Sequence, residues 1–320
     1  MSATGARTAT SGQVAESLHR LEESVGRVVK GKPRVIRQAV VCILARGHML
    51  IEDVPGVGKT TLAQALARSL GLEFQRIQFT SDLLPSDIIG VTVFRQTGQT
   101  FEFVPGPIFA NVVLADEINR TSPKTQSALL EAMSERQVTV DRVRHQLPEP
   151  FVVLATQNPL EHVGTFPLPE SQLDRFLMSL KLGYPPREEE RLLLLSGGAQ
   201  GALAEVRPAV SGEEVLDLQR RVEEVHVTEK LADYILALGE ATRRSEDLVL
   251  GVSTRGVQGL LAATRAAALC EGREFAIPDD VQALAPAVLA HRVVLKGGAG
   301  GLEARREAIR KILRDTPVPT

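Results

Sequence analysis

The stretch MLIEDVPGVGKTTLAQALA, residues 49–67, constrains the fold more than any other part of the chain. An apolar run ends in a loop with two glycines and a lysine, and an amphipathic helix pattern follows. Gly56 and Gly58 can adopt backbone angles closed to other residues, so successive N–H groups can point at one anion. A strand, a glycine-rich loop and a helix in this order predict a phosphate-binding loop.

Two side chains give this loop its chemistry. Lys59 can reach the β- and γ-phosphates of a nucleotide, and the Thr60 hydroxyl can ligate Mg²⁺. Asp53 stands where the strict pattern G-x-x-x-x-G-K-[ST] has its first glycine, but aspartate tolerates unusual backbone angles better than most residues. A plain glycine-rich turn is the alternative, and the flanking strand and helix patterns argue against it. The residues predicted to bind the phosphates are Pro55, Gly56, Val57, Gly58, Lys59, Thr60 and Thr61.

Short apolar runs alternate with helical patterns in the first part of the chain. Near-continuous apolar strands are typical of a parallel sheet that is covered on both faces, so this part predicts an α/β layered fold. Two further segments, 91–106 and 137–147, predict β-hairpins that are extra to the sheet. The predicted strands are 48–52, 74–79, 111–116, 151–156 and 176–182, and the predicted helices are 13–30, 35–45, 60–70 and 123–135.

The character of the chain changes at GYPPREEE, residues 183–190, where two prolines and a charge run predict a boundary. No strand is predicted beyond it, so the second part is expected to be all-helical. Helical patterns occupy residues 187–196, 213–225, 229–243, 254–270, 279–292 and 303–313. The predicted organisation is a disordered tail at 1–12, a nucleotide-binding domain at 13–183 and a helical domain at 184–320.

The strand in NVVLADEINR ends in two acids. Asp116 can hold Mg²⁺ through its water shell, and Glu117 would then orient or deprotonate an attacking water. Thr60 and Asp116 are therefore the predicted metal-binding residues. The next strand, in FVVLATQNP, ends at Asn158, whose amide can position a water beside the γ-phosphate. The alternatives are two solvated acids and a simple Asn-Pro turn.

Two arginines lie outside these motifs. Arg175 follows a short helix in PESQLDRF. An arginine offered to another subunit's nucleotide can accelerate phosphoryl transfer by ~10³–10⁵. The alternative is a surface ion pair between Asp174 and Arg175. Arg255 lies in the first turn of a helix, where a cation opposes the helix dipole, so it is expected to serve an anionic nucleotide in the cleft between the domains.

Composition excludes several classes of protein. The net charge of −2 gives no electrostatic footprint for nucleic acid, and no apolar run reaches the ~20 residues that cross a bilayer. Cys42 and Cys270, the only cysteines, lack metal-ligand spacing and are read as small buried residues in a reducing compartment. The N-terminus lacks the apolar segment of a secretory signal. A cytoplasmic protein is expected.

Taken together, the motifs resemble those of the MoxR-type AAA+ ATPases over nearly the full length of the chain. The segments that carry the resemblance are EDVPGVGKTTLA, VVLADEINRTSPKTQSALLEAMSERQVT, VLATQNPLEHVGTFPLPESQLDRF and STRGVQGLL. By this resemblance Lys59 and Thr60 match Walker A, Asp116 and Glu117 match Walker B, and Asn158 matches sensor 1. In the same way Arg175 matches the arginine finger, Arg255 matches sensor 2, and the hairpin at 91–106 matches an insert in helix 2.

The family implies a three-layer αβα fold with parallel sheet order 5-1-4-3-2, a C-terminal helical lid, and ATP with Mg²⁺ as cofactors. It also implies ATP-dependent rings, usually hexamers, that remodel, assemble or activate partner complexes. Von Willebrand factor A domain proteins are expected partners, and metal insertion is an expected output of some members.

Other functions remain open at this stage. The first is a nucleic-acid translocase of the same insert clade, since the hairpins carry Arg95, Arg142, Arg144 and His145. No basic run interleaved with aromatic residues accompanies these residues, which makes nucleic acid an unlikely partner. A chelatase-like motor subunit shares the same motifs. A metabolic kinase is the remotest alternative, because it has no use for the distant Arg175 and Arg255.

Overall fold

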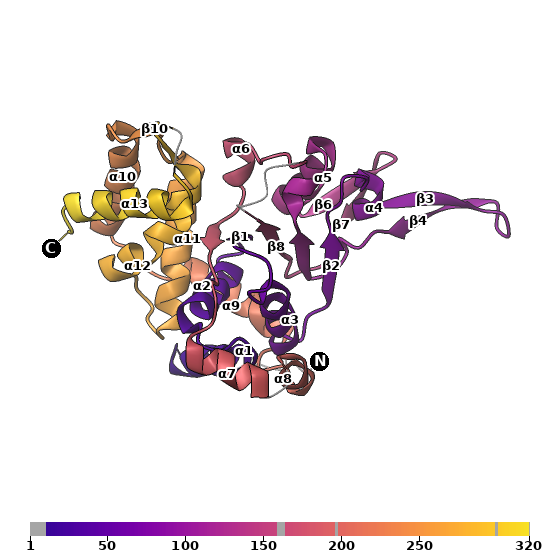
Figure 1. Ribbon diagram of the computed structural model, residues 1–320, viewed down its shortest axis with the longest axis horizontal. Coiled ribbons are helices and arrows are strands. Elements are labelled where there is room, and N and C mark those ends of the chain that lie inside the picture. The colour runs from indigo at the N-terminus through magenta and orange to yellow at the C-terminus, as the bar shows by residue number, and fades with distance from the viewer. Residues whose placement is uncertain (1–10, 159–163, 196–197, 298–299, 320) are drawn as a thin grey trace, which may run out of the picture.

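A computed structural model describes residues 11–158, 164–195, 198–297 and 300–319. At its centre lies a five-stranded sheet in the order β2-β5-β8-β1-β9, in which every neighbouring pair is parallel (Figure 1). Numbered along the chain, these strands give the order 5-1-4-3-2 that the family resemblance implies, so that prediction is confirmed. The strands are β1 (Met49–Glu52), β2 (Phe74–Gln78), β5 (Val112–Asp116), β8 (Val152–Gln157) and β9 (Met178–Leu180).

Both faces of the sheet are buried, which explains why its strands are apolar throughout. In β5, Val112 and Leu114 belong to one core, whereas Val113 and Ala115 belong to the other. Burying one Val or Leu side chain contributes roughly 1.5–3 kcal/mol, so each strand stabilises both layers. The first core includes α1 (Ser11–Val28), α2 (Pro33–Leu44) and α3 (Lys59–Ser69), and the second includes α4 (Pro85–Ile89) and α5 (Pro123–Glu135).

Both predicted hairpins are confirmed. The hairpin of β3 (Gly90–Arg95) and β4 (Thr100–Pro105) extends away from the body of the molecule (Figure 1). The second hairpin joins β6 (Gln137–Val140) to β7 (Val143–Gln146) through Asp141 and Arg142, whose φ values are 49° and 68°. Two successive left-handed residues match the right-handed twist of the strands that they connect.

The second part of the chain is helical, as predicted, but it is not all-helical. A small antiparallel sheet joins β10 (Leu248–Leu250) to β11 (Val294–Leu295), and strands this short show no alternation that a sequence pattern can reveal. The helix predicted at 279–292 ends at Leu289, and a 3₁₀ helix, η2 (Ala290–Arg292), follows. The helices are α7 (Arg187–Leu195), α8 (Gln200–Glu205), α9 (Gly212–Glu224), α10 (Glu229–Arg244), α11 (Thr254–Cys270), α12 (Pro278–Leu289) and α13 (Leu302–Asp315).

The predicted tail at 1–12 is too long, because α1 begins at Ser11, while residues 1–10 lie outside the described residues. The division at residues 183/184 stays a prediction, and helices from both sides of it pack together: α8 contacts α1 and α3, and α9 contacts α2. Cys42 and Cys270 are buried and free, as expected. Among the described residues, no helix is long and apolar enough to span a membrane.

Candidate functional site

The predicted phosphate-binding loop connects β1 to α3, and the helix begins at Lys59. Gly56 and Gly58 have φ values of 82° and 95°, in the region that side chains with a Cβ rarely adopt. A Cβ placed on Gly56 would meet nothing within 4 Å, so the backbone there faces open space. The Lys59 ammonium lies over the loop and donates to the carbonyl oxygens of Asp53 at 2.8 Å and Val54 at 3.2 Å. These backbone angles, the open space beside Gly56 and the nearby Lys59 ammonium suit the binding of an anion by the loop N–H groups.

Asp53 has a structural role that the sequence pattern did not suggest. Its carboxylate accepts from the N–H of Gly183 at 2.6 Å and from that of Val54 at 3.0 Å, and the residue is only 4% exposed. Gly183 follows β9, the strand on one side of β1, while the Asp53 N–H donates to Gln157 of β8 on the other side at 3.2 Å. Asp53 thus fixes the start of the loop to both neighbouring strands.

Asp116 ends β5 and is held by two residues from the flanking strands. The Thr156 hydroxyl of β8 donates to Asp116 Oδ1 at 2.6 Å, and Arg76 Nη2 of β2 donates to Oδ2 at 2.6 Å. Because the Arg76 side chain is 49% exposed, this ion pair contributes only about 1 kcal/mol or less. Sequence reasoning missed Thr156 and Arg76. Their only signal is a polar residue within each strand that adjoins β5.

Glu117 follows Asp116 with a left-handed φ of 59°. Its N–H donates to the Thr156 hydroxyl at 2.9 Å, so one side chain holds both acids. The Glu117 carboxylate accepts from Gln78 Nε2 of β2 and from Arg120 Nε, each at 3.0 Å. Gln78, also missed in the sequence, lies opposite Asp116 in the register of β2 and β5. These contacts fix the orientation of the Glu117 carboxylate.

Asn158 follows β8, which lies between β1 and β5, so the structure brings the loop, the two acids and Asn158 to one edge of the sheet. Asn158 lines a cavity of about 520 Å³ together with Asp53 and Asn119. Glu52 and Arg305 of α13 also line this cavity. Burial raises the pKa of Glu52, and the charges of Arg305 and Arg306 oppose that rise. Residues 159–163 of the Asn158 motif lie outside the described residues.

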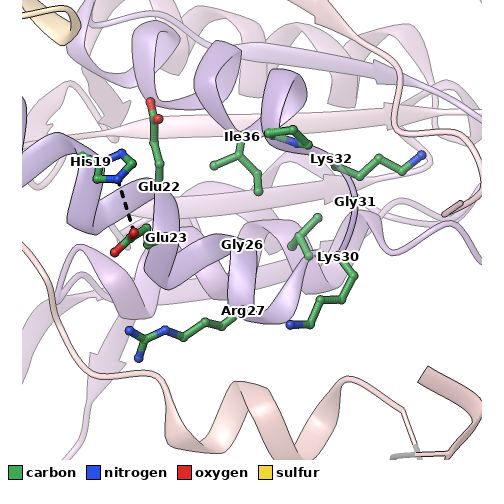
Figure 2. A pocket seen from close by; sticks show the side chains of 11 residues that line it. His19, Glu22, Glu23, Gly26, Arg27, Lys30, Gly31, Lys32 and Ile36 are labelled. Carbon is green, nitrogen blue, oxygen red and sulfur yellow. Dashed lines mark ion pairs between the residues drawn. The ribbon is translucent and has the colours of Figure 1, made fainter. Parts of the chain in front are cut away.

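A cavity of about 200 Å³ adjoins the other side of the loop. Gly56, Gly58 and Thr61 line it, together with Lys30 and Lys32 from the turn between α1 and α2. The two lysines also line a larger groove of about 530 Å³ on the outer face of α1 and α2 (Figure 2). None of the predicted site residues lines that groove. The smaller cavity is therefore the one that can receive part of a nucleotide bound at the loop.

The donor set fits a magnesium triphosphate. Free N–H groups at a helix N-terminus and a lysine suit phosphate oxygens. Hydroxyl and carboxylate oxygens, which Thr60 and Asp116 supply, are the ligands that Mg²⁺ prefers. Pro55 and Val57 contribute backbone to the same loop, and Thr60 and Thr61 lie in the first turn of α3.

Arg175 lies elsewhere. It follows α6 (Glu170–Leu173), and its Nη1 donates to the carbonyl oxygen of Leu130 at 2.7 Å and to Ser134 Oγ at 2.8 Å, near the C-terminal end of α5. Among the described residues Arg175 forms no ion pair, and Asp174 pairs with Arg292 instead. The surface pair of Asp174 with Arg175 is therefore absent. Neither cavity beside the phosphate-binding loop is lined by Arg175.

Arg255, in the first turn of α11, lies close to the Arg175 segment. The N-cap residue Ser253 accepts from the Gly256 N–H at 3.0 Å and donates to Asp174 Oδ2 at 2.9 Å, so α11 begins beside the residue that precedes Arg175. Arg255 is exposed, and we find no hydrogen bond or ion pair of its side chain within the described part of the chain. It lines neither cavity beside the loop. The structure thus places the two arginines in adjoining segments, and neither lines a cavity beside the phosphate-binding loop.

Arg292 of η2 fixes this second region, and sequence reasoning missed it. Its guanidinium donates to Asp174 Oδ1 at 2.8 Å and to the Phe176 carbonyl at 2.6 Å. Burial lowers the pKa of Arg292, whereas the Asp174 charge raises it. A buried arginine that is paired and hydrogen-bonded in this way fixes the segment around Arg175 relative to α12.

Comparison with known proteins agrees with this geometry. Residues 48–178 match the family model described as "ATPase family associated with various cellular activities (AAA)", and residues 240–312 match the AAA lid domain model. A crystal structure of a protein from Cytophaga hutchinsonii superposes with a TM-score of 0.88 at 37% identity, over 97% of each chain. The fold and the site define an AAA-type ATPase with a C-terminal lid.

Relatives identify the family more closely. The chain is 41% identical to Chaperone MoxR1 of Mycobacterium tuberculosis, over 96% of this chain and 84% of the relative. It is 35% identical to Protein MoxR of Paracoccus denitrificans, over 93% and 94%. The uncharacterized protein YeaC of Bacillus subtilis is 48% identical, over 95% and 97%. The chain belongs to the MoxR family of AAA+ ATPases, as its motifs suggested.

Proposed function

We propose that this protein binds ATP with Mg²⁺ at the loop between β1 and α3, hydrolyses it, and uses the cycle to remodel partner proteins. The observation that carries the proposal is the convergence of Lys59, Asp116, Glu117 and Asn158 at one edge of the sheet. A chaperone role rests on family membership and on the name of the relative MoxR1.

Each residue has a distinct task in this mechanism. The N–H groups of residues 56–60 and the Lys59 ammonium bind and orient the triphosphate. Thr60 and Asp116 would hold Mg²⁺, which when bound would neutralise charge that develops on the phosphates. Glu117 accepts a proton from the attacking water, and Gln78 and Arg120 orient its carboxylate. Asn158 positions that water by a hydrogen bond.

The two arginines complete the site from a second copy of the chain. The segments that carry Arg175 and Arg255 adjoin through Ser253 and Asp174, and neither arginine lines a cavity at the phosphate-binding loop of its own chain. An arginine stabilises charge on the transferred phosphoryl group only when it reaches that group. A head-to-tail ring, with six copies expected from the family, lets each subunit supply both arginines to its neighbour.

The client is proposed to meet the hairpin of β3 and β4. Phe94 and Phe101 are 53% and 76% exposed, with ring centroids 5.3 Å apart. Exposed paired aromatics on a projecting hairpin suit binding to apolar segments of a protein. Arg95 pairs with Glu102 at 2.7 Å, which neutralises the basic charge that nucleic acid would need. A von Willebrand factor A domain partner remains a prediction from the family resemblance, and a cytoplasmic location remains a prediction from the sequence.

Calorimetry with ATP and with ADP, each with Mg²⁺, tests the central step. We expect measurable affinity for both nucleotides and release of phosphate from ATP. Failure to bind either nucleotide contradicts the proposal. A separate pulldown tests the client: Glu117→Gln protein in ATP should retain it. Adding Phe94→Ser and Phe101→Ser to that protein should abolish the capture.

A further inference from the structure

Helix α7 presents leucines to solvent without any buried residue of its own. Leu192, Leu194 and Leu195 are 53%, 80% and 74% exposed. A contiguous group of exposed leucines in a well-formed helix is unusual for an isolated soluble surface and typical of one that another protein covers.

The position of α7 is fixed beside the phosphate-binding loop. A Cβ placed on Gly31, in the turn between α1 and α2, would lie 2.6 Å from Pro186 Cδ, so the start of α7 packs closely on that turn. Leu193 lines the same cavity of about 200 Å³ as Gly56 and Gly58. The exposed leucines of α7 therefore border the opening of the nucleotide cavity.

A second exposed apolar group borders the arginines. Val249 and Leu250 of β10 are 69% and 44% exposed, and β10 leads through Ser253 into the first turn of α11, where Arg255 lies. In Figure 1, β10 and α6 lie at the top of the molecule, whereas α7 lies at the bottom. The two apolar groups are thus on opposite sides of the molecule, each beside one half of the proposed composite site.

We infer that α7 of one subunit packs against β10 of the next, in a head-to-tail contact between copies of this chain. This inference rests on the composite site proposed above. Arg175 and Arg255 carry positive charge without a carboxylate partner in the described residues, and a bound triphosphate beside α7 supplies the complementary charge. A neighbour that delivers Arg255 to that triphosphate must bring Val249 and Leu250 to the surface around the cavity, where the leucines lie. The contact is heterologous, because the two surfaces differ, so it generates a ring or a filament instead of a closed dimer.

Disulfide crosslinking tests the pairing directly. Leu194→Cys protein and Val249→Cys protein are mixed with ATP and Mg²⁺ in the Glu117→Gln background, then oxidised. The native Cys42 and Cys270 are buried, and burial raises the pKa of both thiols, so they stay unreactive. We expect crosslinked dimers in the mixture and none in either protein alone. Crosslinking of Leu194→Cys protein with itself would show a symmetric contact and overturn the inference.

Sedimentation supplies the second readout. Leu194→Glu with Leu195→Glu should raise the protein concentration needed for assembly in ATP by at least about tenfold, while ATP affinity stays within about twofold. Val249→Glu should do the same. Leu84→Glu is the matched control and should assemble normally: Leu84 is 58% exposed and directly precedes α4, which lies far from α7 and β10 in Figure 1.

The outcomes separate this inference from the function on which it rests. If wild-type protein binds ATP but remains monomeric at every concentration, the ring itself is wrong. If wild-type protein assembles, and both glutamate variants assemble equally well without a crosslink between positions 194 and 249, only the surface assignment is wrong.

Discussion

The phosphate-binding loop and the arginine region differ in how far each is complete within one chain. Around the loop, Lys59, Asp53 and Asp116 all have hydrogen-bond partners from their own subunit, and Gly56 and Gly58 line a cavity of about 200 Å³. In the arginine region, and within the described residues, Arg175 donates only to uncharged acceptors and the Arg255 side chain has no hydrogen-bond or ion-pair partner. We therefore expect nucleotide binding to be a property of the single chain and rapid hydrolysis to be a property of the assembly.

Removing Arg175 should have the largest effect. Arg175→Ala is expected to lower kcat by ~10³ or more, because the charge on the transferred phosphoryl group loses its counter-charge, while ATP affinity is retained. Steady-state phosphate release and calorimetry measure the two quantities. Arg220→Ala, an exposed arginine that pairs with Asp217 on α9, is the control.

Mixing two inactive variants sharpens this result. Arg175→Ala protein keeps an intact loop, and Lys59→Ala protein keeps an intact arginine, so mixed assemblies contain complete sites. ATPase activity in the mixture should exceed the sum of the separate activities. Wild-type turnover by Arg175→Ala protein alone would refute the shared site.

Glu117→Gln should lower hydrolysis by ~10²–10⁴ and leave binding nearly unchanged. The amide has the same shape as the carboxylate. It loses the ion pair with Arg120 and can no longer accept a proton from water. Single-turnover phosphate release gives the rate, and calorimetry gives the affinity. An equal loss of both would mean that Glu117 acts in binding instead.

Lys59→Ala should weaken ATP binding by about 100-fold or more, since a charge-assisted contact to the phosphates is lost. The variant should still fold, because Lys59 is only partly buried and donates to two backbone oxygens at the surface of the loop. Titration calorimetry measures the affinity, with the exposed Lys124→Ala as the control. Undiminished affinity would exclude this loop as the nucleotide site.

His48 lies between the two regions and should give a smaller, pH-dependent effect on stability. His48 Nδ1 accepts from the Val153 N–H of β8, so its Nε2 carries the proton that is donated to the Met133 carbonyl of α5, the helix that holds Arg175. Burial lowers the pKa of His48 to about 4. The folded protein therefore resists protonation that the unfolded chain accepts at about pH 6.5. This contribution to stability is present above pH 6.5 and is lost as the pH falls towards 4.

The expected loss is roughly 3 kcal/mol over that range, and buried His291, whose pKa burial also lowers, adds to it with the same sign. Urea unfolding at several pH values measures it. His48→Gln should have a shallower pH dependence than wild type. Equal slopes for the two proteins would show that His48 does not carry the effect.

The sequence predicts the loop, the two acids and the alternation of strands and helices, because each depends on residues that are neighbours in the chain. It does not reveal the partners of those residues. Thr156, Arg76 and Gln78 act on the acids from adjacent strands, and their roles follow only once the strand order is known. The order itself came from the family resemblance. Arg292 sits in a segment read as the end of a helix, and only the folded chain shows that it fixes Asp174.

The most direct test of the composite site is the ATPase activity per subunit as a function of protein concentration, measured beside sedimentation under the same conditions. If a second copy completes each site, activity per subunit rises with concentration and levels off as assembly completes. Activity per subunit that stays constant while the protein passes from monomer to assembly would contradict the account.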